Sequence, residues 1–293
     1  MPMLKIRWKF LILLLAIALV PLVVSSLMQR RWASRQGQQL AAEQREVLIN
    51  SARGSLQLII DDYARTLVQM RDVLETVVQV QAQEVSAALA GEVPPDAQAF
   101  PVDWIDQWGG SDEHPALEIG EKDGWGPDGD PIVQLIAPNN HSVIYFGDEE
   151  SVQADVVRVA GVTDKLLLLR GAWPGLIQWQ HTTLTEGAHL CLPGHGGYSH
   201  GYDARQRPSY TSAKAAGELK WTPVIDVSTG LFMVTISMPI YESGELVAMT
   251  SVDVPLSAMV ANLHMPDEWQ DAATVLFARV ETDGSVVALA QID

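Results

Sequence analysis

A charge-free apolar run near the N-terminus limits what this chain can fold into more than any other feature. Phe10 to Met28 contains no charged side chain and, as a helix, is long enough to cross roughly 30 Å of hydrocarbon. A cleaved signal peptide would have a shorter apolar core and small residues at its cleavage site, which Val24 to Ser26 match only loosely. Residues 10–28 are therefore predicted to form a retained transmembrane helix.

The charges around this run favour a cytoplasmic N-terminus, residues 1–9. Lys5, Arg7 and Lys9 precede the run, and basic residues gather on the cytoplasmic side of membrane helices. A second basic group follows the run and weakens this asymmetry, namely Arg30, Arg31 and Arg35. We expect the remainder of the chain to lie outside the cytoplasm.

Composition excludes some functions and leaves others open. The 293 residues are 47% hydrophobic, which is enough to bury a substantial core. The net charge of -17, from 36 acidic and 19 basic residues, argues against nucleic acid as a partner, because phosphate binding requires clustered Lys and Arg. Cys191 is the one cysteine, so no intrachain disulfide forms, and we expect it to be a small apolar core residue.

A long helix is expected over residues 29–91. From Arg35 to Leu89 there is no proline and an abundance of Gln, Ala, Glu and Leu. An apolar seam alternates steps of four and three along it, through Leu56, Ile60, Tyr63, Leu67, Met70, Leu74 and Val77. The seam either packs on the chain's own domain or pairs with a second copy in a homodimer, and the spacing alone does not decide between them.

Turn signals separate this helix from the next part of the chain. Gly91 to Pro95 ends the helix, because glycine and proline both oppose its continuation. Pro101 to Pro131 is rich in Gly, Asp and Trp and is expected to form loops. Three acidic residues there lack the spacing of a calcium loop and are interpreted as solvated turns, namely Asp123, Asp128 and Asp130.

Short apolar runs beyond the loops predict an antiparallel sheet covered by helices, and with the long helix an α+β fold. The turn Glu242 to Glu245 is expected to join the last two runs in a hairpin. The expected strands are Ile132 to Ala137, Ser142 to Phe146, Leu231 to Tyr241 and Leu246 to Val254, followed by a helix at Leu256 to Leu263.

The last segment, residues 264–293, is expected to contain a strand, a turn at Thr282 to Gly284, and a second strand. A lone hairpin is marginal in water, so the segment is interpreted as the start of a second, smaller module that the chain does not complete.

Four segments, in order and spacing, resemble the double Cache (dCache) sensor domains of bacterial signal-transduction receptors, which have a PAS-like fold. These segments are Tyr202 to Tyr210 (YDARQRPSY), Trp221-Thr222, Asp226 to Gly230 (DVSTG) and Ser251 to Asp253 (SVD). Upstream, Trp179 to Tyr198 is similar to the version found before metal-dependent serine/threonine phosphatases. The close resemblance covers about 80 residues.

The resemblance implies a domain plan and a location. Residues 92–263 would be the membrane-distal Cache module, 29–91 a signalling and dimerisation helix, and 264–293 the start of a membrane-proximal module. The chain would be anchored in the bacterial inner membrane with its sensor domain outside the cytoplasm. It would bind a small-molecule ligand, form a homodimer through the long helix and require no cofactor.

The residue types in these segments suit a ligand that carries both charges. Arg207 offers a planar fork of donors to a carboxylate, and Asp253 offers an anion to an amine. Tyr202 and Tyr210 could close a pocket with ring faces that also favour a cation. The alternatives are a salt bridge of Arg207 and Asp253, with each other or with neighbouring residues, that only stiffens the loop, and tyrosines that belong to the core.

The resemblance implies a ligand-binding set of Tyr202, Arg207, Ser209, Tyr210, Val224, Asp226 and Asp253. Ser209 stands where the amino-acid-binding branch has tryptophan, and Val224 where it has tyrosine. A ring face and a hydroxyl are lost, which puts an ordinary amino-acid ligand in doubt and leaves room for a different amine or carboxylate.

No metal or catalytic site is predicted. His181, His189, His195 and His200 lie within twenty residues but lack zinc-ligand spacing, and the glycines around the last two are expected to form an exposed loop. No nucleophile motif, phosphate loop or Rossmann glycine pattern occurs.

The sequence thus predicts a membrane-anchored sensor that passes a conformational signal through its long helix. Three alternatives remain: the receptor half of a phosphatase, kinase or cyclase whose catalytic part lies beyond Asp293, an anchored metal-binding scaffold, and a sensor that binds nothing and only dimerises.

Overall fold

A computed structural model describes residues 6–106, 119–125, 131–226, 228–260, 274–279 and 286–292. The chain divides into two compact units, Met1–Ala64 and Arg65–Asp293. The first contains only the N-terminal part of helix α1 among its described residues. The second contains the C-terminal part of that helix and all the strands.

Helix α1 spans Ile6–Leu89 and has Pro21 inside it. Its end just before Gly91 follows the prediction from glycine and proline. Along the predicted seam, Leu74 and Val77 are buried against the sheet of the second unit, whereas Ile60 in the first unit is exposed. The C-terminal part of the seam therefore packs on the chain's own domain.

The predicted transmembrane run, Phe10 to Met28, lies partly outside the described residues, because the side chains at 10–13 and 16 are not described. Over the part of α1 with described side chains, no stretch is both long and apolar enough to cross a membrane.

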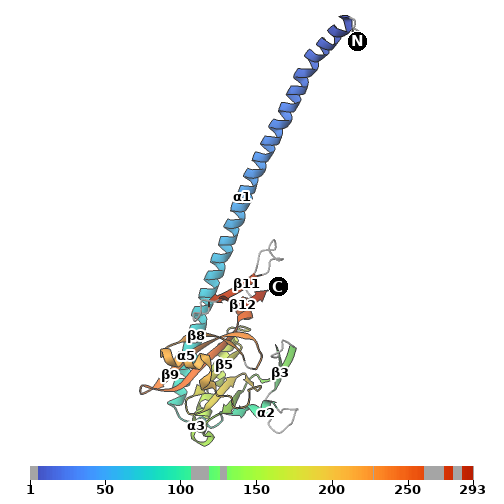
Figure 1. Ribbon diagram of the computed structural model, residues 1–293. Coiled ribbons are helices and arrows are strands. Elements are labelled where there is room, and N and C mark those ends of the chain that lie inside the picture. Colours follow the sequence, from blue (N-terminus) through green and yellow to red (C-terminus); the bar gives the residue numbers. More distant parts are fainter. Residues whose placement is uncertain are drawn as a thin grey trace. The chain divides into compact units, whose positions relative to one another are not determined.

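A seven-stranded sheet in the order β1-β4-β6-β5-β10-β9-β8 forms the centre of the second unit (Figure 1). Only β1 and β4 pair in parallel, and every other neighbouring pair is antiparallel. The last five strands of that order form a PAS-like antiparallel sheet. Of the four strands predicted from the sequence, three lie in the seven-stranded sheet, and the fourth, at Ile132 to Ala137, belongs to a second sheet. The strands are β1 (Ala99–Pro101), β4 (His141–Tyr145), β5 (Trp179–Leu184), β6 (Ala188–Leu192), β8 (Lys220–Ile225), β9 (Phe232–Glu242) and β10 (Glu245–Pro255).

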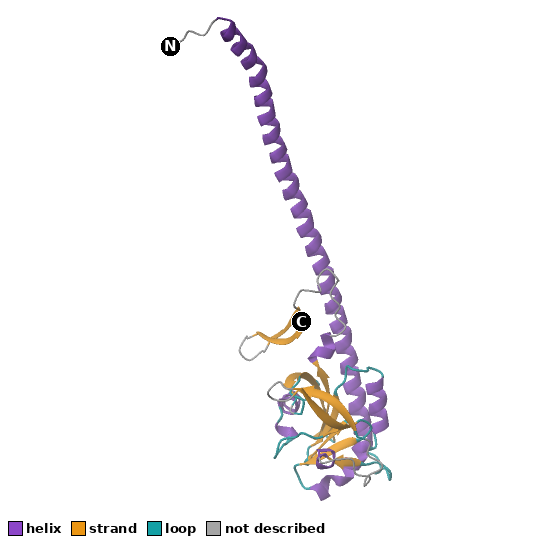
Figure 2. Ribbon diagram, turned by 90° about the vertical axis from the view of Figure 1, so that its right-hand side faces the viewer, coloured by secondary structure: helices purple, strands orange, loops and turns teal. Residues whose placement is uncertain are grey.

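One face of this sheet carries the apolar core. Helices α3 (Glu149–Ala160) and α4 (Thr163–Gly171) and the C-terminal part of α1 cover it (Figure 2). Successive strand residues point to opposite faces, so Val252 and Val254 of β10 enter this core. Asp253, between them in the sequence, faces the other side.

The opposite face is covered by shorter elements. They are the 3-10 helix η1 (Ala204–Gln206), α5 (Pro208–Ala216), α2 (Val102–Asp106) and a second sheet of order β2-β3-β7. That sheet consists of β2 (Gly120–Trp125), β3 (Pro131–Ala137) and β7 (Gly194–His195). Asp123 therefore lies in a strand and not in the predicted turn, because Gly120 to Trp125 pairs with β3. Asp128 and Asp130 lie outside the described residues.

The predicted hairpin of β9 and β10 is confirmed. Its turn consists of Ser243 and Gly244, whose φ values of 53° and 89° are both positive. Two-residue turns of this hand match the twist of the paired strands, and glycine adopts the conformation without steric cost. Helix α6 (Leu256–Val260) follows β10, and the rest of the helix predicted to end at Leu263 lies outside the described residues.

Two strands near the C-terminus form the second predicted hairpin. β11 (Thr274–Arg279) and β12 (Val286–Ile292) pair antiparallel, and the turn between them lies outside the described residues.

Candidate functional site

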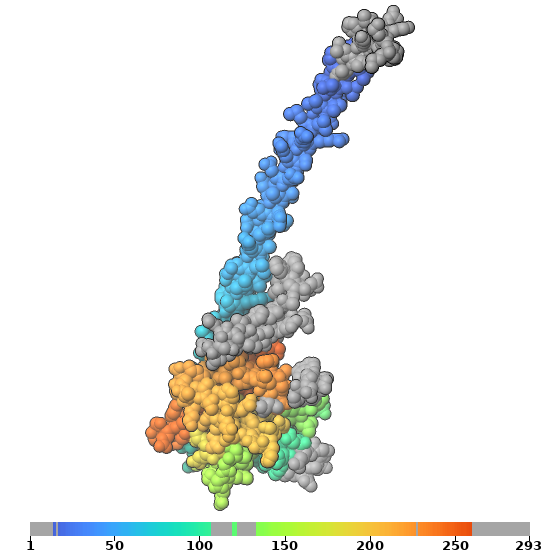
Figure 3. All heavy atoms as spheres, viewed as in Figure 1, coloured from blue at the N-terminus to red at the C-terminus, as the bar shows by residue number. Residues whose placement is uncertain are grey.

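A cavity of about 50 Å³ lies between the main sheet and the segment that contains η1 and α5. Its walls come from the strand residues that alternate with the apolar core, such as His181, Ser251 and Asp253. Figure 3 shows part of the covering segment among the yellow and orange atoms at the surface. All the residues predicted from the resemblance line this cavity: Tyr202, Arg207, Ser209, Tyr210, Val224, Asp226 and Asp253.

The two arginines of the covering segment have different roles. Arg205 pairs with Asp203 at 2.9 Å, donates to the Thr185 carbonyl and lies over the Phe146 ring, so it holds the segment in place. Arg207 is half-buried and lines the cavity, and its guanidinium donates to the Ile225 carbonyl at 3.3 Å. Within the described ranges, no carboxylate forms an ion pair with Arg207, so its fork of donors is available to an anion.

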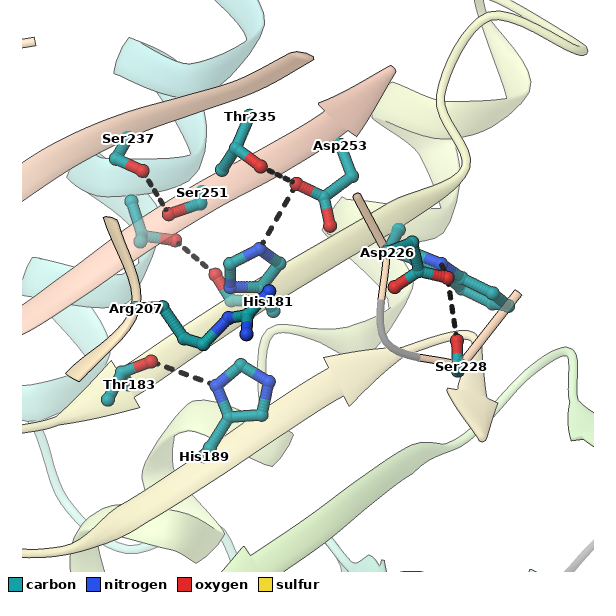
Figure 4. Close-up of polar contacts among 12 residues, drawn as sticks. His181, Thr183, His189, Arg207, Asp226, Ser228, Thr235, Ser237, Ser251 and Asp253 are labelled. Atoms are coloured by element: carbon teal, nitrogen blue, oxygen red, sulfur yellow. Dashed lines mark hydrogen bonds and ion pairs between the residues drawn. The ribbon is translucent and has the colours of Figure 1, made fainter. Parts of the chain in front are cut away.

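Asp253 is 8% exposed and lies near the end of β10. Its Oδ1 accepts a hydrogen bond from Thr235 Oγ1 at 2.6 Å and lies 3.4 Å from His181 Nε2 (Figure 4). Both contacts that Asp253 makes with described side chains use Oδ1, which leaves Oδ2 for a ligand. A direct salt bridge from Arg207, the alternative that the sequence left open, is not formed between these two described residues.

Asp226 also lines the cavity, but it holds its own loop. Its Oδ2 accepts from Ser228 Oγ at 2.7 Å and from the Thr229 backbone N–H at 2.9 Å, and Trp179 Nε1 approaches it at 3.4 Å. Burial raises the pKa of Asp226, but the nearby His195 and these donors outweigh burial, so the pKa lies below its ordinary value. The carboxylate is therefore charged and mostly satisfied by the chain.

The two tyrosines of the predicted set face different neighbours. The ring of Tyr202 lies 4.7 Å from that of Tyr198 and 5.8 Å from that of His189, measured between ring centroids. The pKa of Tyr202 lies above its ordinary value, mainly because of burial. The charge of Arg207 opposes this rise and that of Asp253 adds to it, so both charges act on the phenol. Tyr210 packs on Ala213 and Met249 and lines the cavity as well, so it belongs to both core and wall.

The predicted exposed loop around His195 and His200 is wrong for His195, which is buried, whereas His200 is exposed. His195 lines the cavity together with His181 and His189. Burial lowers the pKa of His189 well below its ordinary value, and His181 and His195 add to this effect. Its imidazole is thus neutral at neutral pH, and its Nδ1 lies 2.8 Å from Thr183 Oγ1 (Figure 4).

The His195 ring is buried against Trp179 and Tyr198, and Asp106 of α2 packs on the glycines that follow it. The Asp106 carboxylate accepts from the Gly197 backbone N–H at 3.0 Å and packs where a side chain at Gly196 would have to lie. His195 Nδ1 lies 2.8 Å from the Gly196 carbonyl, which can only accept, so Nδ1 carries the hydrogen and Nε2 accepts from Tyr198. Gly196 therefore permits a close packing that a larger residue would block.

Cys191 is buried, and burial raises the pKa of its thiol well above the ordinary value, as expected for an unreactive core cysteine. Over the described residues, no group of three or more His, Cys, Asp or Glu side chains has the arrangement of a metal site.

Comparison with known families identifies one matching segment. Residues 195–261 match the family model described as methyl-accepting chemotaxis protein-like, first PDC sensor domain. This range includes every residue predicted to bind a ligand. No curated protein matches the chain.

Several solved structures share limited similarity with the chain. The ligand-binding domain of the Pseudomonas aeruginosa PAO1 amino-acid chemoreceptor PctC, in complex with GABA, is 26% identical over 34% of this chain and 46% of that chain, with a TM-score of 0.29. That of PctB from the same organism, in complex with L-Arg, is 22% identical over 41% of this chain and 51% of that chain, with a TM-score of 0.34. The PctB complex with L-Gln is 17% identical over 71% and 65% of the two chains, with a TM-score of 0.33.

This chain thus spans about half the length of the first two of these domains. At such TM-scores the superpositions define neither the fold nor the ligand. The family match supports the resemblance drawn from the sequence: residues 195–261 are similar to a Cache- or PDC-type sensor domain of chemoreceptors.

Proposed function

We propose that this chain is the extracytoplasmic sensor portion of a membrane-anchored bacterial receptor, and that a small amine, carboxylate or amino-acid-like molecule binds in the cavity between Arg207 and Asp253. One observation carries the proposal: residues from the covering segment, β8, its following loop and β10 converge on one cavity. Arg207 and Asp253 supply opposite charges there without pairing with each other. We propose no catalytic role for the described residues.

The ligand-binding role is tested by thermal denaturation of the full chain in detergent, with a panel of amines, carboxylates and amino acids. A ligand at a hundred times its Kd stabilises the folded state by about 2.7 kcal/mol. That stabilisation raises the Tm by roughly 5–10 °C for a unit of this size. Arg207→Ala should abolish the shift for compounds with a carboxylate.

Arg71→Ala is the matched control, because Arg71 lies on the exposed surface of α1, where it pairs with its neighbour Asp72, and is not among the residues that line the cavity. It should retain the full shift. An equal shift in wild type and Arg207→Ala, with every carboxylate that binds, would place the ligand elsewhere.

We propose that ligand binding alters how the sheet contacts α1. Gln81 of α1 is fully buried, and its Nε2 donates to Thr250 Oγ1 at 2.7 Å and to the Ser251 carbonyl at 3.0 Å. Ser251 also lines the cavity. A shift of β10 toward a ligand would therefore change a polar contact inside the helix–sheet interface. Such a signal requires the ligand to bind one arrangement better than the other.

Hydrogen exchange tests this route. The backbone amides of α1 near Gln81 should change protection when a ligand from the panel binds. Unchanged exchange along the second unit's part of α1, with ligand bound, would remove this helix from the signal.

The membrane anchor is part of the proposal. The uncharged run at 10–28 supports it, with residues 1–9 in the cytoplasm and the sensor domain outside the bacterial inner membrane. After alkaline extraction of bacterial membranes, the full chain should remain in the pellet and a variant without 10–28 should not. Release of the full chain would contradict the anchor.

We also propose a homodimer through the long helix. Ile60 continues the apolar seam beyond the part that packs on the sheet and is 56% exposed. The chain's one cysteine, Cys191, is buried, so an Ile60→Cys variant should form disulfide-linked dimers on mild oxidation. Leu58→Cys, which is exposed but off the seam, should form fewer. Equal crosslinking of the two would argue against pairing at the seam.

The domain plan belongs to the same proposal, with a membrane-distal module at 92–263 and the start of a membrane-proximal one at 264–293. A second candidate is the receptor half of an enzyme, favoured by the similarity of Trp179 to Tyr198 to the version found before metal-dependent phosphatases. Sequencing the gene beyond the codon for Asp293 distinguishes the two.

A further inference from the structure

The cavity is small for a ligand site. Its volume of about 50 Å³ holds about three to five water-sized groups, at roughly 10–15 Å³ for each. Pockets for larger ligands measure about 300–1,000 Å³. Serine in place of the larger tryptophan at position 209 would by itself enlarge the space, so other side chains must fill it.

Two imidazoles narrow the cavity. His181 on β5 and His189 on β6 have ring centroids 5.0 Å apart. The His189 ring also lies in edge-to-face geometry with two phenols, with ring centroids 5.9 Å from Tyr198 and 5.8 Å from Tyr202. Neither histidine belongs to the set that the resemblance predicted.

These rings are held in place. His189 Nδ1 is hydrogen-bonded to Thr183 Oγ1 at 2.8 Å, and the His189 side chain is buried. His181 Nε2 faces Asp253, while its Nδ1 is buried without a hydrogen-bond partner among the described residues. Moving either ring aside would break a contact inside a packed wall, which costs free energy.

The charge of the wall favours a cationic group. Asp226 and Asp253 contribute two carboxylates against the one guanidinium of Arg207. Asp253 Oδ2 is the acceptor that described side chains leave unused, and Tyr198 and Tyr202 line the same cavity.

We infer that the cavity selects a compact ammonium compound of about three to five non-hydrogen atoms, with its nitrogen on Asp253, and that His181 and His189 set the upper limit of its size. This inference rests on the proposed function. It assigns specificity to two residues that contact the ligand from the side opposite the covering segment.

The test measures the Kd and thermal shift of the full chain in detergent with ethylamine, ethanolamine, glycine, GABA and L-arginine. The first three should raise the Tm of wild type, and GABA and L-arginine should bind at least about tenfold more weakly, the discrimination expected for each poorly accommodated methylene. Asp253→Asn should remove the shifts.

His189→Ala should gain at least about tenfold in affinity for GABA, because the space of the ring becomes available. If that variant does not fold, His181→Ala gives the same comparison from the neighbouring strand. His200→Ala is the matched control, since His200 is exposed and outside the cavity wall, and it should keep the wild-type order of affinities.

Strong wild-type binding of GABA or L-arginine that requires Asp253 would overturn the size limit and leave the proposed site intact. Binding of none of the five compounds would overturn the ammonium class. The proposed function then stands only if another compound of its wider panel still gives an Arg207-dependent shift.

Discussion

Replacement of Gln81 by leucine should destabilise the second unit more than any other change to a polar residue on α1. Gln81 is 0% exposed, and its amide makes three hydrogen bonds of 2.7–3.0 Å, two as donor to β10 and one as acceptor from Gln180 Nε2. Each is worth about 1 kcal/mol net, and an unsatisfied buried partner costs about 1–3 kcal/mol. Burial of the leucine side chain returns about 1.5–3 kcal/mol.

The expected loss for Gln81→Leu is therefore about 2–4 kcal/mol of the free energy of unfolding. Urea denaturation of the full chain, followed by tryptophan fluorescence, measures it. Gln83→Leu, two residues along the helix and exposed, should change stability by less than about 0.5 kcal/mol.

A double variant tests the mechanism. Gln81→Leu combined with Gln180→Leu removes both partners of one hydrogen bond. The loss of unfolding free energy in the double variant should therefore be about 1 kcal/mol smaller than the sum of the losses in the two single variants. The reasoning would be refuted if Gln81→Leu cost no more than Gln83→Leu, or if the two losses were simply additive.

Three further predictions concern folding. Burial lowers the pKa of His141 to about 4, below the unfolded value of 6.5. Between these two pH values only the unfolded state takes up the proton, so the folded state is at full stability above pH 6.5 and loses stability as the pH falls toward 4. His141→Gln should reduce this acid sensitivity by up to about 3 kcal/mol in urea melts, whereas His200→Gln should not. Leu190→Ala, fully buried, should cost about 2–5 kcal/mol by the same assay, against little for Leu168→Ala, which is 75% exposed. Gly187→Ala should lower the Tm by several degrees, because φ is 124° there and a Cβ would meet the backbone of the adjacent turn.

The strands were predictable wherever the signal was local. The apolar run from Leu231, the turn at Ser243-Gly244 and the run up to Val254 correspond to β9 and β10, because strand length and turn type are set by adjacent residues. The meeting of Arg207 and Asp253 at one cavity followed from the resemblance and not from any local rule. The sequence did not reveal that Arg205 anchors the segment, since that depends on Phe146 and Thr185, far away in the chain.

The histidines of the cavity could not be placed from their neighbours. His195 lies between glycines, which locally indicate an exposed loop, but its ring packs between Trp179 and Tyr198, at centroid distances of 4.2 Å and 4.9 Å. His189 reaches the cavity because β6 pairs with both β5 and β4. His181 and His189 point to the cavity face of the sheet, on the side opposite the apolar core. That face can be assigned from the sequence only once the register of the paired strands is known.

A crystal structure of the chain with the panel compound that gives the largest thermal shift would decide whether this cavity is the ligand site. We expect electron density for that compound inside the cavity, within hydrogen-bonding distance of Asp253. Density at another surface, with the side chains between Asp253 and Arg207 unchanged, would contradict the proposed site.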